Sequence, residues 1–492
     1  MRLSLEVEER FAAASGDFSP LHVSDSYGRT TPFGQPVAHG ACAALACCGF
    51  FTPPAGSYPS ALRVVFYRPL FRDLEYDLDL AQTSAERACF GLMDGSRRVM
   101  EAVVEYAPGV PPIAVLPGTP VAPRGVARLL SEGDLTGAWA TEGSYSPGAS
   151  RYLALLDTLG VQREAWGDGL PITLMAASYL TGMELPGERA LFFRLRADLP
   201  QAPVELPGVL RQDLTEYGRR SGMVKSGFRL SGGGRVWSSG EMQAFLRPLR
   251  SPAARIPGGV SPEAAERFAG KTALVVGASR GFGSALALAL AGAGATVVAL
   301  YARSREDAEG LVAAAAGQPG RILPVQGDAG DPATCRQIRQ RILSEHGRLD
   351  WLVCSAAPPL QPLHIEAAAF DRIGSFLRDG FALALAPLSA FLDLLSDSGG
   401  TALVVSSIAV ENPPAIWPHY VALKSAVEGL VRVAAAEYPK ASFCIARPAK
   451  LRTDLVNSPM ASVDAEDPSV AAARILSDAA LQARPGEVSY LK

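Results

Sequence analysis

From about residue 265 onward, short apolar runs alternate with glycine turns and helical stretches. Residues 272–276 form an apolar run, and the segment 277–283 (GASRGFG) follows it and opens a helical pattern. A glycine turn between a strand and a helix directs helix N–H groups at a phosphate, which suits a dinucleotide. The repeated units predict an α/β Rossmann-type fold over residues 265–492, with a doubly wound parallel sheet.

Length and charge bound the domain count and the partners. The 492 residues predict roughly three domains. The 46 basic and 49 acidic residues nearly balance, so no basic face is expected for nucleic acid and no polybasic anchor for a membrane. Two long apolar runs, 37–56 and 285–301, are interrupted by prolines or glycines and are expected to be buried elements. We therefore expect a small or carrier-bound substrate, with no nucleic-acid and no membrane partner.

The cysteines and histidines give no sign of a metal site. The chain has seven cysteines and five histidines, without the spacing of metal ligands. The thiols are interpreted as reduced packing residues. The first ten residues are too charged for a signal peptide, and a cytoplasmic protein is expected.

Residues 15–22 (SGDFSPLH) place a carboxylate, Asp17, and an imidazole, His22, around a proline. A regular helix would point these two side chains away from each other, and Pro20 disfavours helix at Ser19. The two groups can converge only if the chain turns between them. The octapeptide alone leaves two interpretations open, an ordinary turn or a catalytic pair.

The segment that follows is a small-residue helix at about 41–50 and then strand-like runs at 62–67, 75–80 and 99–106. Together with residues 31–34 (TPFG) and 38–40 (AHG), the octapeptide resembles the signature of MaoC-type hot-dog hydratases, which are (R)-specific enoyl-thioester hydratases and dehydratases. The resemblance implies one buried helix against a curved antiparallel sheet. It also implies that Asp17 and His22 are the acid/base pair that activates water, and that the Gly40 N–H is an oxyanion donor.

A second segment follows a proline-rich connector at 107–125. It has strand-like runs at 190–195 and 236–245, and its residues 177–187 resemble the partner half of fused MaoC proteins. It has no second Asp-to-His motif. We predict an α+β double hot dog, with a catalytic domain at 1–110 and a non-catalytic half at 125–250 that shapes an acyl tunnel. The alternative is an unrelated α+β spacer.

A proline- and glycine-rich linker at 251–262 precedes the last segment, whose decisive residues are Ser407, Tyr420 and Lys424. Tyr420 and Lys424 lie one helical turn apart, on the same face. With the glycine turn, this pattern resembles a short-chain dehydrogenase/reductase of the 3-oxoacyl-thioester ketoreductase type. The resemblance implies that Tyr420 protonates a carbonyl oxygen that Ser407 holds, while Lys424 binds the nicotinamide ribose. Lys424 and a bound nicotinamide would lower the phenol pKa from about 10.

Charge around the expected nucleotide favours NADPH (NADP) as the cofactor. After the strand at 296–301, arginines stand where NAD-dependent proteins would place an acidic residue for the ribose 2′-hydroxyl. Arg280 and Arg303 fit a 2′-phosphate, and the alternative is a solvated arginine pair. The expected cofactor-binding residues are Gly277, Ser279, Arg280, Gly281, Gly283, Arg303, Ser304, Asp328, Lys424 and Thr453.

Two departures from the reductase pattern stand out. The family's Asn-Asn-Ala-Gly is CSAA at 354–357, and its proton-relay asparagine corresponds to Leu377. A water could replace the relay amide with slow turnover. Ser407, Tyr420 and Lys424 are intact, so an active reductase is expected.

The two resemblances predict a bifunctional enzyme. It would reduce a 3-oxoacyl thioester, on coenzyme A or an acyl carrier protein, and dehydrate the (R)-3-hydroxyacyl product to a trans-2-enoyl thioester, as in fatty-acid or polyketide biosynthesis. One alternative is a degradative hydratase and dehydrogenase. Another is a reductase whose front part only binds an acyl carrier. A homodimer is expected from both families.

Overall fold

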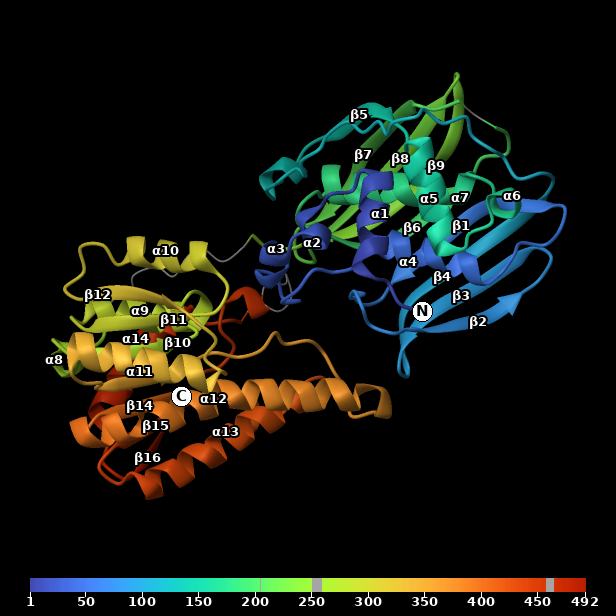
Figure 1. Ribbon diagram of the computed structural model, residues 1–492. Helices are drawn as coiled ribbons and strands as arrows, with labels where there is room; N and C mark the ends of the chain where they lie inside the picture. The colour runs from blue at the N-terminus through green and yellow to red at the C-terminus, as the bar shows by residue number, and fades with distance from the viewer. Residues whose placement is uncertain (204, 250–258, 457–463) are drawn as a thin grey trace. The chain divides into compact units, whose positions relative to one another are not determined.

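The computed structural model describes residues 1–203, 205–249, 259–456 and 464–492, and they form two compact units (Figure 1). The first unit contains Met1–Arg29 and Gln35–Leu249. The second contains Thr30–Gly34 and the described residues from 259 onward. Residues 251–258 of the expected linker lie outside the described part of the chain.

The first unit is built on a nine-stranded sheet with the order β2-β3-β4-β1-β6-β9-β8-β7-β5. Its strands are β1 (Ser57–Phe66), β2 (Asp77–Thr83), β3 (Arg87–Asp94), β4 (Arg97–Pro108), β5 (Ala140–Tyr145), β6 (Ala190–Asp198), β7 (Gly208–Gly218), β8 (Met223–Gly232) and β9 (Arg235–Leu246). Its helices are α1 (Leu5–Ser15), α2 (Pro20–Val23), α3 (Asp25–Arg29), α4 (Gly40–Cys47), α5 (Ala149–Leu159), α6 (Arg163–Trp166) and α7 (Gly169–Tyr179). All of its strand pairs are antiparallel, as the sequence predicts for this part.

The helices α4 and α7 form the centre of the first unit. They contact each other, α4 also contacts β4, and α7 also contacts β1 and β9. Both are apolar on nearly all sides, and every residue of α7 is buried, which is typical of a helix wrapped by the rest of a domain. Residues 1–110 supply α4 and β1–β4, while α7 and β5–β9 come from residues 125–250.

The two expected segments therefore share one sheet. Val64 of β1 pairs with Leu195 of β6, which joins them in a single unit. The sequence missed β3, β5, β7 and β8. In β3, Gly91 interrupts the apolar pattern, and a Cβ there would lie 2.9 Å from the Met100 carbonyl oxygen.

The second unit is a seven-stranded parallel sheet of order β12-β11-β10-β13-β14-β15-β16. Its strands are β10 (Thr272–Val276), β11 (Thr296–Tyr301), β12 (Arg321–Gln326), β13 (Trp351–Cys354), β14 (Thr401–Val405), β15 (Ser442–Ala446) and β16 (Val488–Leu491). Its helices are α8 (Pro262–Phe268), α9 (Gly281–Gly292), α10 (Arg305–Ala314), α11 (Pro332–His346), α12 (Phe370–Ser398), α13 (Pro418–Glu437) and α14 (Pro468–Gln482). The predicted Rossmann-type sheet is confirmed, and the strand order reverses between β10 and β13, where such sheets bind ligands.

Within the described residues, one helical stretch, Ala367–Ser398, is long and apolar enough to cross a membrane by length and composition. It includes α12, which contacts α11, α13, β13 and β14 of the second unit, and half of its most apolar window is buried there.

Candidate active sites

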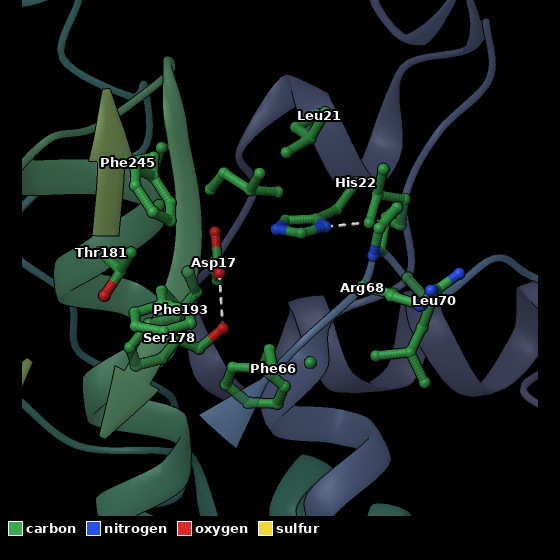
Figure 2. A pocket seen from close by; sticks show the side chains of 18 of the residues that line it. Asp17, Leu21, His22, Phe66, Arg68, Leu70, Ser178, Thr181, Phe193 and Phe245 are labelled. Atoms are coloured by element: carbon green, nitrogen blue, oxygen red, sulfur yellow. Dashed lines mark hydrogen bonds between the residues drawn. The ribbon is translucent and has the colours of Figure 1, made fainter. Parts of the chain in front are cut away.

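A pocket of about 170 Å³ opens in the first unit beside α2, α4 and α7 (Figure 2). Its lining is mostly apolar, with a few polar groups at one side, which is typical of a small-molecule site. The structure brings three predicted site residues, Asp17, His22 and Gly40, to this pocket. The lining also includes Leu21, Phe66, Arg68, Ser178, Thr181, Gly182, Phe192, Phe193 and Phe245.

His22 lies on the short helix α2, which Pro20 begins. Its Nδ1 lies 2.7 Å from the Val37 carbonyl oxygen. A carbonyl oxygen can only accept, so in the neutral ring Nδ1 carries the hydrogen and Nε2 has a free lone pair. Burial and the neighbouring His39 lower the pKa of His22 to about 4, which keeps the ring neutral at physiological pH. His22 can therefore act as a base through Nε2.

Asp17 follows the end of α1, where Gly16 adopts a left-handed conformation (φ 76°) and reverses the chain. The carboxylate is buried, and two donors hold it: the Ser178 hydroxyl on Oδ2 at 2.6 Å and the Ser19 N–H on Oδ1 at 3.1 Å. A Cβ on Gly182 would lie 2.3 Å from Oδ1, so only glycine leaves room for the carboxylate there. Asp17 is thus fixed beside His22, with contacts from both segments of the first unit (Figure 2).

Gly40 is the first residue of α4, so its N–H has no acceptor within the helix. A Cβ at this position would lie 2.7 Å from the Phe66 ring, and glycine is required for this packing. A helix N-terminus that lines a pocket can stabilise negative charge on a ligand oxygen.

The sequence did not identify Glu8 or Ser178, and it gave His39 only as part of the AHG motif. Glu8 lies on the buried face of α1 with Phe11 and Ala12, and a charged residue on that face is the only sequence signal. Glu8 and His39 lie behind the pocket and form one cluster with His22 and Asp17, which line it. One side-chain ligand atom each of Asp17, His22 and His39 lies within 4.8 Å of the others. Both ring nitrogens of His39 already have hydrogen-bond partners, Glu8 and the Asp17 backbone oxygen, whereas His22 stacks on His39 and bonds to Val37.

The second unit carries the glycine turn between β10 and α9. A Cβ on Gly277 would lie 2.8 Å from the backbone of Ala356, and one on Gly283 would lie 2.1 Å from the Gly277 carbonyl oxygen. Gly277 and Gly281 also have positive φ angles, 80° and 59°. Side chains at Gly277 and Gly283 would clash with this packing, as is typical of a glycine loop that binds phosphate, and α9 begins at Gly281. These residues therefore fit a dinucleotide pyrophosphate.

Ser407, Tyr420 and Lys424 lie near the carboxyl end of β14. The Lys424 ammonium donates to the Val405 carbonyl oxygen at 2.7 Å and lies 5.7 Å from the centre of the Tyr420 ring. Burial lowers the pKa of Lys424 to about 8. Burial raises the pKa of Tyr420, and its hydrogen bond with Ser407 opposes this. The predicted lowering by Lys424 together with a bound nicotinamide stays a prediction.

Glu428, one turn after Lys424, holds these elements together and was not predicted. Its buried carboxylate accepts from the Ser406 hydroxyl at 2.6 Å and from two guanidinium nitrogens of Arg447 at 2.9 and 2.5 Å. It therefore ties α13 to the residues that follow β14 and β15.

The remaining predicted cofactor residues lie around the glycine turn and at the ends of strands. Thr453 is close to Gly281, since a Cβ added to Gly281 would lie 3.7 Å from Cγ2 of Thr453. Asp328 is exposed after β12, where its Oδ1 accepts from the Gly330 N–H. Ser279 lies in the glycine turn, Arg303 is exposed after β11, and Ser304 directly precedes α10 without a side-chain capping bond. Arg280 lies 3.9 Å from the Asp454 carboxylate, so its predicted role at a 2′-phosphate competes with an ion pair.

The two departures from the reductase pattern have structural counterparts. Leu377 lies on α12 and packs against the same core as Tyr420, so this position is apolar. Cys354 ends β13, and burial raises the pKa of its thiol to about 12. Neither side chain can transfer a proton at physiological pH.

Two families match separate parts of the chain. Residues 3–72 match the MaoC-like domain, and residues 271–462 match the short-chain dehydrogenases. The chain is 36% identical over 110 residues to versicolorin reductase stcU of Emericella nidulans, which covers 22% of this chain and 41% of that protein. It is 32% identical over 176 residues to cis-4-hydroxycyclohexanecarboxylate dehydrogenase of Sinomonas cyclohexanicum, covering 35% of this chain and 69% of that protein.

Solved structures with a similar fold cover somewhat less than half of the chain. A short-chain dehydrogenase from Burkholderia cenocepacia in complex with NADP is 26% identical, with a TM-score of 0.42, and 46% of this chain and 98% of that one are covered. An alcohol dehydrogenase from Thermococcus sibiricus complexed with 5-hydroxy-NADP is 26% identical, with a TM-score of 0.40 and coverage of 45% and 94%.

Proposed function

We propose that this chain, which belongs to the short-chain dehydrogenase family and carries a MaoC-like domain ahead of it, is a bifunctional ketoreductase and dehydratase. It reduces a 3-oxoacyl thioester and then removes water from the (R)-3-hydroxyacyl product to give a trans-2-enoyl thioester. The observation that carries the proposal is the free lone pair of His22 Nε2 beside Asp17 in an apolar pocket, on the same chain as Ser407, Tyr420 and Lys424.

In the dehydratase reaction, Gly40 polarises the thioester carbonyl and so acidifies the adjacent C–H bond. His22 Nε2 accepts the proton from that carbon. As the C3–O bond breaks, the same nitrogen returns the proton to the leaving hydroxyl, while Asp17 accepts a hydrogen bond from the departing water. The geometry supports these roles of His22 and Asp17, because Nδ1 of His22 is hydrogen-bonded to Val37 and the Asp17 carboxylate accepts a hydrogen bond from Ser178.

In the reductase reaction, a bound nicotinamide cofactor supplies hydride to the carbonyl carbon. Ser407 donates a hydrogen bond to the carbonyl oxygen, and Tyr420 gives that oxygen a proton. Lys424, which Val405 anchors, holds the cofactor ribose and stabilises the phenolate that remains.

We propose NADPH as the cofactor, with Arg280 and Arg303 at its 2′-phosphate. The absence of an acidic residue directly after β11 favours this choice. The Arg280–Asp454 pair favours the rival, an NAD-dependent degradative hydratase and dehydrogenase. Saturation curves with NADPH and NADH separate the two, and a lower KM for NADH would contradict the biosynthetic direction.

The first unit is proposed to be a double hot dog, with residues 1–110 as the catalytic half and 125–250 as the half that shapes an acyl tunnel. Phe192, Phe193 and Phe245, which come from the second half, support this by lining the pocket. The substrate is proposed to be carried on coenzyme A or an acyl carrier protein. We also propose a cytoplasmic homodimer.

The test uses one variant for each site of the full-length chain. Asp17→Asn should abolish enoyl product and leave the 3-hydroxyacyl product intact. Tyr420→Phe should abolish NADPH oxidation and leave hydration of an added enoyl thioester intact. If Asp17→Asn has no effect on the enoyl product, the first unit only binds the acyl carrier and the dehydratase proposal is wrong.

A further inference from the structure

His39 is buried behind the pocket, and both nitrogens of its ring face hydrogen-bond acceptors. Nδ1 lies 2.6 Å from Glu8 Oε2, and Nε2 lies 3.1 Å from the backbone oxygen of Asp17. A carboxylate and a carbonyl oxygen accept but do not donate, so each ring nitrogen must carry a hydrogen to make its bond. A histidine with two N–H groups is an imidazolium. The contacts of His39 therefore match the positively charged form.

Glu8 is the group that compensates this charge. Its Oε2 also accepts from the backbone N–H of His39 at 2.9 Å, and the Glu8 side chain is only 3% exposed. A buried carboxylate and a buried imidazolium are each costly alone, and together they offset much of that cost. The Glu8–His39 pair is thus a fixed charge arrangement inside the first unit.

The ring of His22 lies directly on that of His39. The ring centres are 4.0 Å apart and the planes differ by 27°. Two stacked imidazolium rings would repel each other strongly in a buried site, so a charge on His39 disfavours one on His22. His39 Nε2 also lies 3.8 Å from Asp17 Oδ2, so the pair is close to the second polar group of the pocket.

We propose that the buried Glu8–His39 pair is a positioning unit of the dehydratase site: Glu8 keeps His39 positively charged, and this charge keeps His22 neutral beside Asp17. The role in dehydration rests on the proposed function. Neither Glu8 nor His39 lines the pocket, so both act through His22 and Asp17 and not on the substrate.

The other groups around the pair do not supply a competing charge. Phe11 of α1 packs its ring 5.0 Å from that of His39. Cys42 of α4 is a neutral thiol, because burial and the nearby Glu8 raise its pKa. Ser178 of α7 is uncharged. Arg68 is charged, but it lines the pocket, which Glu8 and His39 do not.

The pKa shifts of the two histidines agree with this arrangement. Burial works against a charge on His39, but Glu8 and then Asp17 outweigh it and raise the pKa of His39. Burial first and His39 second lower the pKa of His22 to about 4, and the opposing effect of Glu8 on His22 is smaller. Removal of the Glu8 charge should therefore neutralise His39 and, on balance, raise the pKa of His22.

The test combines histidine NMR with a pH profile, using Glu8→Gln. The chain has five histidines, so ring-¹⁵N-labelled protein gives few signals, and His22→Gln and His39→Gln assign the two of interest. Wild-type His39 is expected to be doubly protonated at pH 7 and His22 to be protonated on Nδ1 alone. In Glu8→Gln, the acid limb of kcat/KM for enoyl-thioester hydration should move up by about one pH unit.

Glu9→Gln is the matched control, because Glu9 is exposed on the same helix, and it should leave the profile and the spectra unchanged. A neutral His39 in the wild-type protein would overturn the proposal, and this measurement does not depend on whether Glu8→Gln folds. An unshifted acid limb in folded Glu8→Gln would overturn it as well. Failure of the wild-type protein to hydrate any enoyl thioester would instead contradict the proposed function, and the NMR result would still decide the charge on His39.

Discussion

Ser178 donates a 2.6 Å hydrogen bond to Asp17 from a position 161 residues further along the chain. Asp17 follows the end of α1 in the first half of the unit, whereas Ser178 lies on the central helix α7 of the second half. The segment without an Asp-to-His motif therefore completes the site of the segment that has one.

Ser178→Ala should weaken the dehydratase. A hydrogen bond to a charged group contributes about 1.5–3 kcal/mol, so a loss of roughly 10- to 100-fold in kcat/KM for hydration is expected. Ser144→Ala, at an exposed serine of β5, is the control. Equal activities of the two variants would show that Ser178 does not hold Asp17 in its working position.

Gly182→Ala should displace the Asp17 carboxylate, because the new methyl group would start 2.3 Å from Oδ1. We expect at least a tenfold loss of hydratase activity with an unchanged rate of NADPH-dependent reduction. The control is Gly137→Ala, since a Cβ at Gly137 has no neighbour within 4 Å. Parallel losses in both activities would point to misfolding and not to a local effect.

The pH profile of hydration should reflect the low pKa of His22. Burial and His39 lower this pKa to about 4, so His22 stays neutral and able to accept a proton from pH 8 down to about pH 5. The kcat/KM for an enoyl thioester should fall only below that range, as long as circular dichroism shows a folded protein. An acid limb near 6.5, the value of an ordinary histidine, would contradict this assignment.

Lys424 should affect the pH dependence of the free energy of unfolding as well as catalysis. Burial lowers its pKa to about 8 in the folded state, against an ordinary value of about 10.4 in the unfolded chain. Between these values Lys424 binds more protons in the unfolded state, so its contribution to the free energy of unfolding should rise with pH, by up to about 1.4 kcal/mol per pH unit.

Lys424→Met should remove this rise in stability and also abolish reduction. Urea unfolding at pH 8, 9 and 10 measures the first effect, and NADPH oxidation the second. Lys440→Met, at an exposed position of the same unit, should retain the wild-type pH dependence of stability and the wild-type rate of reduction. Equal pH slopes of the free energy of unfolding in the wild type and in Lys424→Met would contradict this contribution of Lys424.

The Rossmann-type sheet could be predicted from local patterns. The run before Gly277 is β10, and the apolar run 285–301 divides into α9 and β11 around Gly292 and Gly294, as the sequence indicated. Each of these features depends on residues that are close in the sequence, where the positions of glycines and the apolar periodicity are informative.

The candidate site of the first unit could be predicted only in part. Asp17, His22 and Gly40 were identifiable from the motifs that resemble the MaoC signature. Ser178 was not, because its role depends on how α7 packs, and a buried serine on an apolar helix has no local signal. Glu8 resembles any charge on an amphipathic helix until the fold buries it against His39.

Isotope transfer tests whether the two reactions take place consecutively on one chain. The full-length protein is supplied with a 3-oxoacyl thioester and NADPH that carries deuterium in the transferred position, and the products are identified by mass. The expected product is an enoyl thioester that retains one deuterium at C3, because hydride is delivered to the carbon that later loses only its hydroxyl group. A deuterated 3-hydroxyacyl thioester with no enoyl product, or no deuterium incorporation at all, would contradict this expectation.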